Sequence, residues 1–373
     1  MKNLKDLFGK TYHPLNKISI SQKNLLHNYN YLSSINRNIQ IAPVLKSNAY
    51  GHGLIQIAKI LEVTDAPFIC VDSLFEAYEL LKNSIKKQVL IMGYIDPKNL
   101  KVKNLPFSYA IYDTSQLEAL NEYQKKSQVH IKVDTGMHRL GVPTENLDVF
   151  LKNSLMYTNV QIVGLMSHFA QGNDSKSKIT KLQIENFIKA KTAAEKHKLE
   201  IKYFHISASD GLLCMPKTIT NISNVARTGI ALYGISHDSH LKPVIELSSK
   251  IVQIKKLNPG ESVGYDSSFT ANKKIKLAVL PIGYNDGVDR RLSNVGFVKV
   301  RNHYCKIVGR VSMNITTIDI SNIKNAKIGQ EVIIYSQDPQ DKNSIANTAK
   351  LCKTIPHDIL IHLHPTAIRR EII

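Results

Sequence analysis

Residues 42–53 read Ala-Pro-Val-Leu-Lys-Ser-Asn-Ala-Tyr-Gly-His-Gly, an apolar run that ends at Lys46 and is followed by a small, polar, glycine-rich turn. A lysine at the end of a buried strand is costly to keep charged, and an uncharged amine is a nucleophile that can form a Schiff base. The glycines that follow allow a ligand to approach the backbone closely. The alternative interpretation is a lysine that merely ends a strand and extends into water.

Similar apolar runs alternate with helix-like stretches up to about residue 230. They cover residues 40–45, 67–71, 88–92, 108–112, 129–133, 160–165, 203–206 and 224–227. Alternating strands and helices predict parallel pairing and an α/β class. Eight such units favour a closed (β/α)8 TIM-like barrel over an open sheet.

Two helix starts are predicted from the capping-box pattern, in which a serine is followed three residues later by a glutamate. The pairs are Ser73 with Glu76 and Ser115 with Glu118. A longer amphipathic helix is predicted over residues 181–197.

After about residue 240, strand-like runs follow one another with turn signals between them and little helix. The runs cover residues 247–254, 275–280, 296–300, 304–311, 316–320 and 330–334. We therefore predict a barrel domain over residues 12–240 and a mostly β C-terminal domain over residues 241–373. An early strand-like run at residues 16–20 is compatible with either domain.

Composition limits the classes of function. The 373 residues carry a formal charge of +19 and a sequence pI near 9.6, which raises nucleic-acid binding as an alternative. The lysines are scattered, however, and form no basic stripe with interleaved aromatics. A solvated, lysine-rich surface that attracts small anions is the favoured interpretation, and no nucleic-acid partner is predicted.

Neither a membrane span nor a secretory signal is expected, because no apolar run is long enough. The four cysteines show neither metal-ligand spacing nor the density of a disulfide framework; they are Cys70, Cys214, Cys305 and Cys352. We expect a cytoplasmic protein with reduced, structural cysteines and no metal.

Unusual polar residues fall where the barrel strands are predicted to end. Besides Lys46, these are the segments 132–141, 167–169, 207–210 and 227–230. Active sites of such barrels lie at the carboxyl ends of the strands, and glycines beside serines and backbone amides suit a phosphate group. The residues alone thus predict a phosphate-bearing cofactor or substrate near a Schiff-base lysine. They do not distinguish a site for pyridoxal 5'-phosphate (PLP) from an aldolase-type site for a phosphosugar.

Five segments resemble the alanine racemase family in the right order: residues 46–53, 132–141, 164–170, 227–234 and 309–313. The resemblance implies a PLP-dependent homodimer with shared active sites. It would racemise L-alanine to D-alanine, which supplies peptidoglycan synthesis.

In this family, two bases work on opposite faces of the substrate. By resemblance, Lys46 carries PLP and takes the α-proton of the D-isomer. Tyr265, supplied across the dimer interface, takes that of the L-isomer.

The resemblance also assigns the supporting roles. Cofactor-binding residues would be Lys46, Tyr50, His168, Ser209, Arg227, Gly229 and Ile230. Substrate-binding residues would be Arg139 and Met313, the latter from the partner subunit, and Lys132 matches a lysine that is often carbamylated in the family.

Some positions depart from the family pattern. Ala208 stands where an asparagine is usual, Ser312 and Asn314 replace a cysteine and an aspartate, and the tail around Pro365 shows no phosphate-contacting tyrosine. A racemase for another amino acid, such as serine or lysine, is therefore the main alternative. A barrel-type PLP decarboxylase is a further alternative, but the Arg139 and Met313 segments resemble the racemase instead. A single-barrel, non-catalytic PLP-binding protein is another, but such proteins lack the second β domain and its tyrosine.

Overall fold

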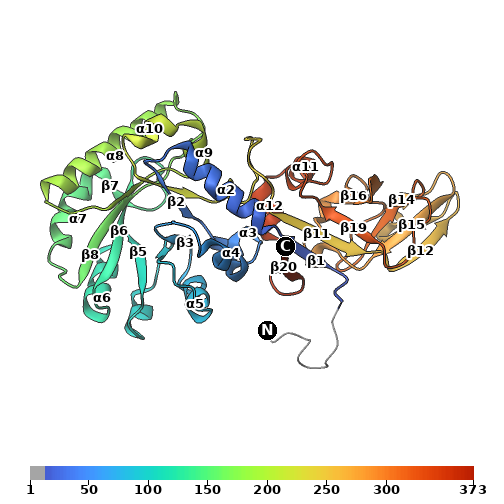
Figure 1. The fold of residues 1–373 in the computed structure, drawn as a ribbon, viewed down its shortest axis with the longest axis horizontal. Coiled ribbons are helices and arrows are strands. Elements are labelled where there is room, and N and C mark those ends of the chain that lie inside the picture. The colour runs from blue at the N-terminus through green and yellow to red at the C-terminus, as the bar shows by residue number, and fades with distance from the viewer. Residues whose placement is uncertain (1–12) are drawn as a thin grey trace. The chain divides into compact units, whose positions relative to one another are not determined.

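The computed structural model describes residues 13–373, which form two compact units. The barrel unit contains residues 24–50 and 54–241. The β unit contains residues 13–23, 51–53 and 242–373. Figure 1 labels many of the helices and strands of both units.

The barrel unit is built on eight parallel strands, which pair in a group of two and a group of six and are joined into a ring by individual backbone contacts. In ring order, they are β2 (Gln40–Pro43), β3 (Ile69–Val71), β4 (Val89–Ile91), β5 (Phe107–Ile111), β6 (Ser127–Asp134), β8 (Val160–Met166), β9 (Tyr203–His205) and β10 (Val225–Thr228). β10 pairs with β2. The chain just after β2 then joins β3, because the amide of Leu45 donates to the carbonyl of Cys70 in β3 at 2.7 Å. The ring closes where the amide of Asn224 donates to the carbonyl of Phe204 at 3.0 Å. Each strand overlaps one predicted run, so the (β/α)8 prediction is confirmed.

Helices connect the strands and lie outside the ring (Figure 1). They are α2 (Gln22–Ile35), α4 (Leu54–Leu61), α5 (Leu74–Lys82), α6 (Thr114–Tyr123), α7 (Leu147–Ser154), α8 (Lys178–Lys196), α9 (Ser209–Cys214) and α10 (Pro216–Thr220). The capping box at Ser73 is present at the start of α5. The one predicted at Ser115 is wrong, because Asp113 lies two residues earlier and its carboxylate accepts from the Ser115 amide at 2.8 Å.

Aromatic and imidazole rings fill the interior of the barrel. The rings of Phe68 and Tyr203 pack edge-on with their centroids 5.2 Å apart, and the rings of Phe68 and His130 do so with their centroids 5.3 Å apart. Gly164 lies directly opposite His130 in the β6–β8 register. A Cβ at Gly164 would come within 2.2 Å of the imidazole Nδ1, so a glycine is required for this ring to occupy the interior.

The β unit is mostly β-structure, as predicted. Its six-stranded sheet has the order β17 (His303–Lys306), β16 (Phe297–Val300), β19 (Glu331–Tyr335), β11 (Ile245–Lys250), β1 (Lys17–Ile20) and β20 (Arg369–Ile372). A second sheet contains β12 (Gln253–Leu257), β15 (Ile275–Leu280) and β18 (Thr316–Asp319), and β13 (Ser262–Val263) pairs with β14 (Phe269–Thr270). Two short helices complete the unit, α11 (Ile345–Leu351) and α12 (Pro356–Ile361).

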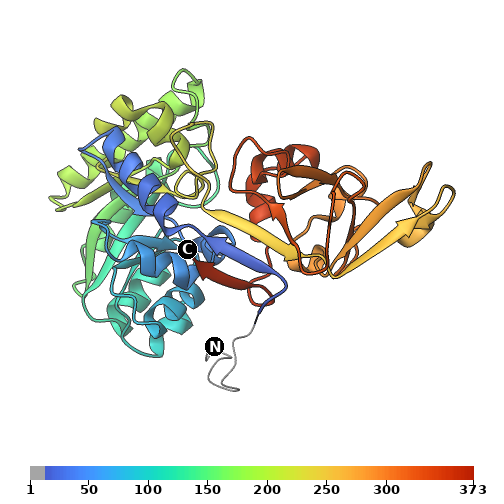
Figure 2. The same cartoon turned by 45° about the vertical axis from the view of Figure 1, so that its right-hand side comes forward.

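The early strand β1 belongs to the β unit. It pairs antiparallel with β11 and parallel with β20, and Figure 2 shows β1 in blue beside β20 in dark red. The described part of the chain therefore runs from this sheet into the barrel unit and returns to it.

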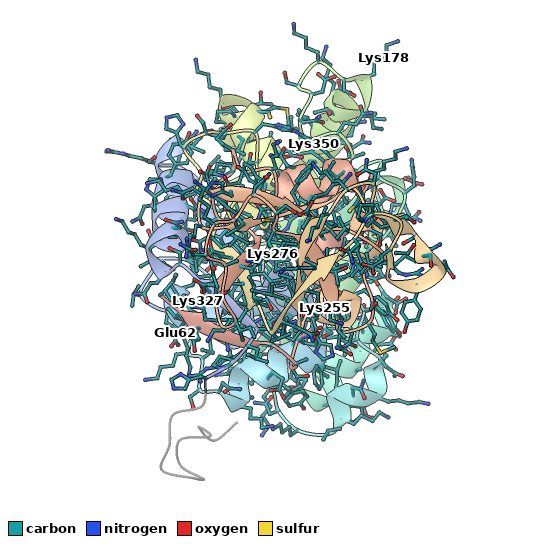
Figure 3. The ribbon with its side chains drawn as sticks, turned by 90° about the vertical axis from the view of Figure 1, so that its right-hand side faces the viewer. Glu62, Lys178, Lys255, Lys276, Lys327 and Lys350 are labelled. Carbon is teal, nitrogen blue, oxygen red and sulfur yellow. The ribbon has the colours of Figure 1, made fainter. Side chains whose placement is uncertain are left out.

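Lysine side chains are spread over both units. Lys178 begins α8, Lys255 lies on β12 and Lys350 lies in α11 (Figure 3). None of the helices within residues 13–373 is long and apolar enough to cross a bilayer.

The packing of Gly164 against His130 predicts that Gly164→Ala is strongly destabilising. Overpacking a close-packed interior costs about 1–3 kcal/mol, and a ring inside a barrel has little room to move. The urea midpoint should fall markedly. Gly172→Ala is the matched control. Its added Cβ would lie 3.3 Å from its nearest neighbour, the amide nitrogen of Gly211, so a small shift relieves the contact and a smaller decrease of the midpoint is expected. Equal midpoints for the two variants would contradict the packing described.

Candidate active site

The residues proposed for the site within the barrel unit lie at or just beyond the carboxyl ends of its strands. Lys46 follows β2 and its side chain is half-buried. Lys132 lies on β6 and Arg227 on β10, and both are buried, with 8% and 4% of their surface exposed. The remaining ones are Tyr50, Arg139, His168, Ser209, Gly229 and Ile230. The barrel therefore gathers nine of the eleven residues that the sequence nominates.

A left-handed turn follows Lys46 directly. Ser47, Asn48, Ala49 and Tyr50 all have φ between 52° and 55°. Left-handed backbone costs L-residues roughly 1–2 kcal/mol each and is normally adopted by single residues only. Four in succession must be stabilised by surrounding contacts, and such strained segments cluster at functional sites.

Side chains within the barrel unit hold this turn. The carboxylate of Glu76 in α5 accepts from the amide of Asn48 at 3.3 Å and from the amide of Asp72 at 2.9 Å. The side-chain oxygen of Asn48 accepts from the amide of Leu54 at 2.8 Å. The turn is thus fixed to the end of β3 through Glu76 and to the start of α4 through Asn48.

Tyr50 ends the turn and points towards the strand end at Gly229. A Cβ added to Gly229 would lie 2.4 Å from the Tyr50 hydroxyl, so only glycine fits here. The Ser209 hydroxyl accepts from the amides of Gly229 and Ala231 at 3.2 and 3.3 Å. The Tyr50 and Ser209 hydroxyls therefore converge on the backbone amides of this segment, of which those of Gly229 and Ala231 are engaged by Ser209. Hydroxyls beside backbone amides suit a phosphate.

Arg227 lies below this cradle in the barrel interior. Its guanidinium donates to the carbonyls of His205 and Ser167, both at 2.6 Å, and to Nδ1 of His205 at 2.7 Å. None of these partners is a carboxylate, so none of them neutralises the positive charge of the guanidinium. Burial lowers the pKa of Arg227 to about 10, which still leaves it charged at neutral pH.

The bonds of Arg227 fix the tautomers of two buried histidines. Because arginine can only donate, Nδ1 of His205 is an acceptor and its proton lies on Nε2. That Nε2 lies 2.7 Å from Nδ1 of His130, which must accept in turn. Burial and then the Arg227 charge lower the pKa of both imidazoles, to about 3 for His130, so both are neutral.

His168 and Lys132 experience the same positive environment. Burial, followed by Arg227 and Arg139, lowers the pKa of His168 to about 3. Burial and the same two arginines lower the pKa of Lys132 to about 8, against a raising effect from Asp72. Lys132 therefore loses its proton near pH 8, well below the pH at which a free lysine does.

Arg139 lies in the loop after β6. The carboxylate of Asp134 organises this loop by accepting from three successive amides, Gly136 to His138, each at 3.0 Å. A Cβ at Gly141 would lie 2.4 Å from the amide nitrogen of Asp134, so the loop can pass this close to the end of β6 only with a glycine here. The Arg139 side chain is exposed.

Tyr265 and Met313 belong to the β unit, where both side chains are exposed, at 69% and 56%. Tyr265 follows β13 in a short turn in which Gly264 and Asp266 have positive φ. Arg310 holds this turn through an ion pair with the Asp266 carboxylate at 2.9 Å. A tyrosine so exposed on a braced turn is available to another molecule.

Sequence reasoning missed three supports of the site. It identified a polar turn after Lys46 but not its left-handed course, which Asn48 and the two glycines that follow hint at. It used Glu76 only as a helix cap and did not find the contact with Asn48. His130 and His205 gave no signal, because a histidine in an apolar run is usually structural.

Among residues 13–373, no cluster of three or more histidines, cysteines or carboxylates could hold a metal ion. The four cysteines are free.

The chain matches two family models over most of its length. Residues 20–237 match the alanine racemase N-terminal domain, and residues 244–371 match the alanine racemase C-terminal domain. The chain belongs to the alanine racemase family. The alanine racemase of Syntrophobacter fumaroxidans is 32% identical over 354 residues, which cover 92% of this chain and 93% of that relative.

Solved structures of the family share this fold. Alanine racemase of Clostridium difficile 630 aligns with a TM-score of 0.90 and 26% identity, over 97% of each chain. Alanine racemase from Bartonella henselae with covalently bound pyridoxal phosphate aligns with a TM-score of 0.84 and 26% identity, over 97% of this chain and all of that one. Racemases of this family depend on PLP, and the hydroxyl and amide cradle beside Lys46 fits its phosphate.

The buried histidines predict a loss of stability in mild acid. His130, His168 and His205 are neutral in the fold, but in the unfolded chain they bind protons below about pH 6.5. The unfolded state then binds more protons, so the free energy of unfolding falls as the pH decreases. Each histidine contributes up to about 1.4 kcal/mol per pH unit.

Urea unfolding of the cofactor-free protein between pH 6.5 and 5 tests this, because most carboxylates remain ionised there. The midpoint should decrease steadily over that range. A constant midpoint would contradict the neutral, buried state of these rings.

Proposed function

We propose that this protein interconverts L-alanine and D-alanine with PLP held on Lys46, and that it works as a homodimer. The observation that carries the proposal is the half-buried amine of Lys46, directly after β2, beside the cradle formed by Tyr50, Ser209 and the Gly229 segment. Membership of the alanine racemase family supports it. The proposed role is the supply of D-alanine for peptidoglycan.

PLP, when bound, provides an electron sink that stabilises the charge left on the α-carbon after its proton departs. The protein must then deliver and remove protons on both faces of that carbon. We assign the Lys46 amine to the D-face and the phenol of Tyr265 from a second copy to the L-face. This division explains why one chain alone does not supply a complete site.

The other residues hold and tune the reacting groups. Tyr50 and Ser209, with the backbone amides of Gly229 and Ile230, would bind the phosphate. Arg227 would face the pyridine nitrogen and, because it can only donate, would leave that nitrogen unprotonated.

Groups above the ring would position the substrate. His168 is neutral and is suited to stacking beside the cofactor. Arg139 would bind the substrate carboxylate, with the backbone amide of Met313 from the second copy.

We place the protein in the cytoplasm, and its four free cysteines fit a reducing compartment.

Racemisation of another amino acid is the second candidate. Ala208 is the residue before α9, beside the cradle, and Asn314 donates to the Asp286 carboxylate at 3.2 Å in the β unit. Both differ from the family pattern. Comparison of L-alanine, L-serine and L-lysine as substrates decides between the candidates.

Incubation with L-alanine in deuterium oxide, followed by chiral analysis, tests the reaction and the substrate together. We expect D-alanine that carries deuterium at the α-carbon, because the returned proton comes from the solvent-exchanged base. Cofactor-loaded protein that produces no D-alanine from L-alanine would refute alanine racemisation.

Tyr265→Phe should abolish racemisation while leaving the cofactor bound. Loss of a general base typically costs about 10²–10⁴-fold in rate. Exchange of the α-proton of D-alanine with solvent should persist in this variant, because Lys46 still serves that face. Tyr157→Phe is the control, since this tyrosine lies in the loop before β8, at the other end of the strands. Normal racemisation by Tyr265→Phe would remove the tyrosine from the mechanism.

Lys132 is proposed to be carbamylated, because a carbamate forms only on an uncharged amine. With ¹³C-bicarbonate, a carbamate resonance should grow as the pH rises through about 8, where the Lys132 amine loses its proton. Free lysines lose theirs only near about 10.4, whereas an α-amino group titrates near about 8 and gives its own resonance. Lys132→Arg should lack one resonance of the wild-type protein, and an unchanged set of resonances in that variant would assign the carbamate to another amine.

A further inference from the structure

Arg370, on the last strand β20, places a cationic side chain among backbone carbonyls of the β unit. Its Nε and Nη2 donate to the carbonyl of Gly51 at 3.0 and 2.9 Å. Nη1 donates to the carbonyls of Pro365 and His364 at 2.8 and 3.1 Å. A guanidinium has five donors in a rigid fork, so it can bind several carbonyls at once where lysine cannot.

The side chain is bound without a carboxylate partner among residues 13–373. Burial lowers the pKa of Arg370 to about 10, so it stays charged at neutral pH. Taking such a charge out of water is costly unless its donors are satisfied. Here carbonyl oxygens alone satisfy them, so the position depends on the fork geometry and not only on the charge.

Gly51 is held from a second side as well. A Cβ at Gly51 would lie 2.1 Å from the carbonyl oxygen of Leu360 in α12, and its φ is +76°. Only a glycine meets both conditions. The backbone at Gly51 is thus confined between Leu360 and the Arg370 guanidinium.

Gly51 is also the residue directly after the left-handed turn of residues 47–50. Chain connectivity means that the position of its carbonyl determines how the turn ends. Glu76 and Asn48 hold the beginning and middle of the turn, whereas the Arg370 clamp holds its exit. Lys46 and Tyr50 lie at the two ends of this strained segment.

We infer that Arg370 is a positioning residue for the reaction proposed above: by holding the Gly51 carbonyl, it fixes the exit of the left-handed turn and so orients the Lys46 amine and the Tyr50 hydroxyl. The inference rests on the proposed function. A purely structural role, in which Arg370 only ties the tail segment 363–368 to itself, would leave the cofactor and the turnover unchanged.

Arg370→Met tests the clamp, because methionine keeps an unbranched apolar stem and removes every donor. With folding checked by circular dichroism, we expect kcat to fall about 10- to 100-fold, the loss that a small misplacement of catalytic groups produces. The visible absorption of the bound cofactor should shift or weaken, and cofactor should dissociate faster. The KM for alanine should change less than kcat.

Arg369→Met is the matched control. It removes the same charge from the neighbouring residue, which is exposed and pairs with the Glu371 carboxylate at 3.0 Å. Wild-type kcat and cofactor absorption are expected for this variant. Wild-type kcat and absorption in Arg370→Met as well would overturn the inference.

Arg370→Lys covers the case in which Arg370→Met does not fold. It keeps the charge and the stem but cannot place two donors on one carbonyl, so partial loss of kcat and an altered cofactor band are expected. A folded Arg370→Lys protein with wild-type values would also overturn the inference. If the wild-type protein fails to racemise alanine, the proposed function falls, whereas the cofactor absorption of the variants still decides the role of Arg370.

Discussion

The left-handed turn after β2 is the constraint on which the candidate site depends. Four consecutive residues adopt a backbone that none of them favours, and the turn carries Lys46 at its start and Tyr50 at its end. A carboxylate from α5 and an amide oxygen within the turn stabilise it locally. The barrel is therefore more than a scaffold, because its helices provide the groups that keep this strained segment in place.

Positive charge is the second organising feature. Arg227 lies in the barrel interior with carbonyls and neutral histidines as its partners. Burial lowers the pKa of His130, His168 and Lys132, and the Arg227 charge lowers it further. Such a site is poorly balanced without an anion. A phosphate-bearing cofactor would supply the missing negative charge, which links the electrostatics of the barrel to its proposed ligand.

Much of the fold could be predicted from the sequence, because parallel barrel strands are continuous apolar runs separated by helix signals. The eight runs from Gln40 to Arg227 were found on that basis. The cap predicted at Ser115 was wrong because the Asp113 carboxylate caps this helix two residues earlier. The assignment of β1 to the β unit could not be predicted, since its partners, β11 and β20, lie more than 200 residues away in sequence.

The site was predictable in its residue types but not in its supports. Lys46, Arg227 and Ser209 stand out because polar residues at strand ends are unusual. The tautomers of His205 and His130 depend on the direction of the hydrogen bonds from Arg227, and the contact of Glu76 with Asn48 joins α5 to the left-handed turn. Neither leaves a local pattern in the chain.

The central claim is that the fold singles out the Lys46 amine among many lysines. Loading with PLP, reduction with borohydride and peptide mapping test it most directly. The account predicts one modified peptide, with the label on Lys46. A label spread over surface lysines, or fixed on a different lysine, would contradict it.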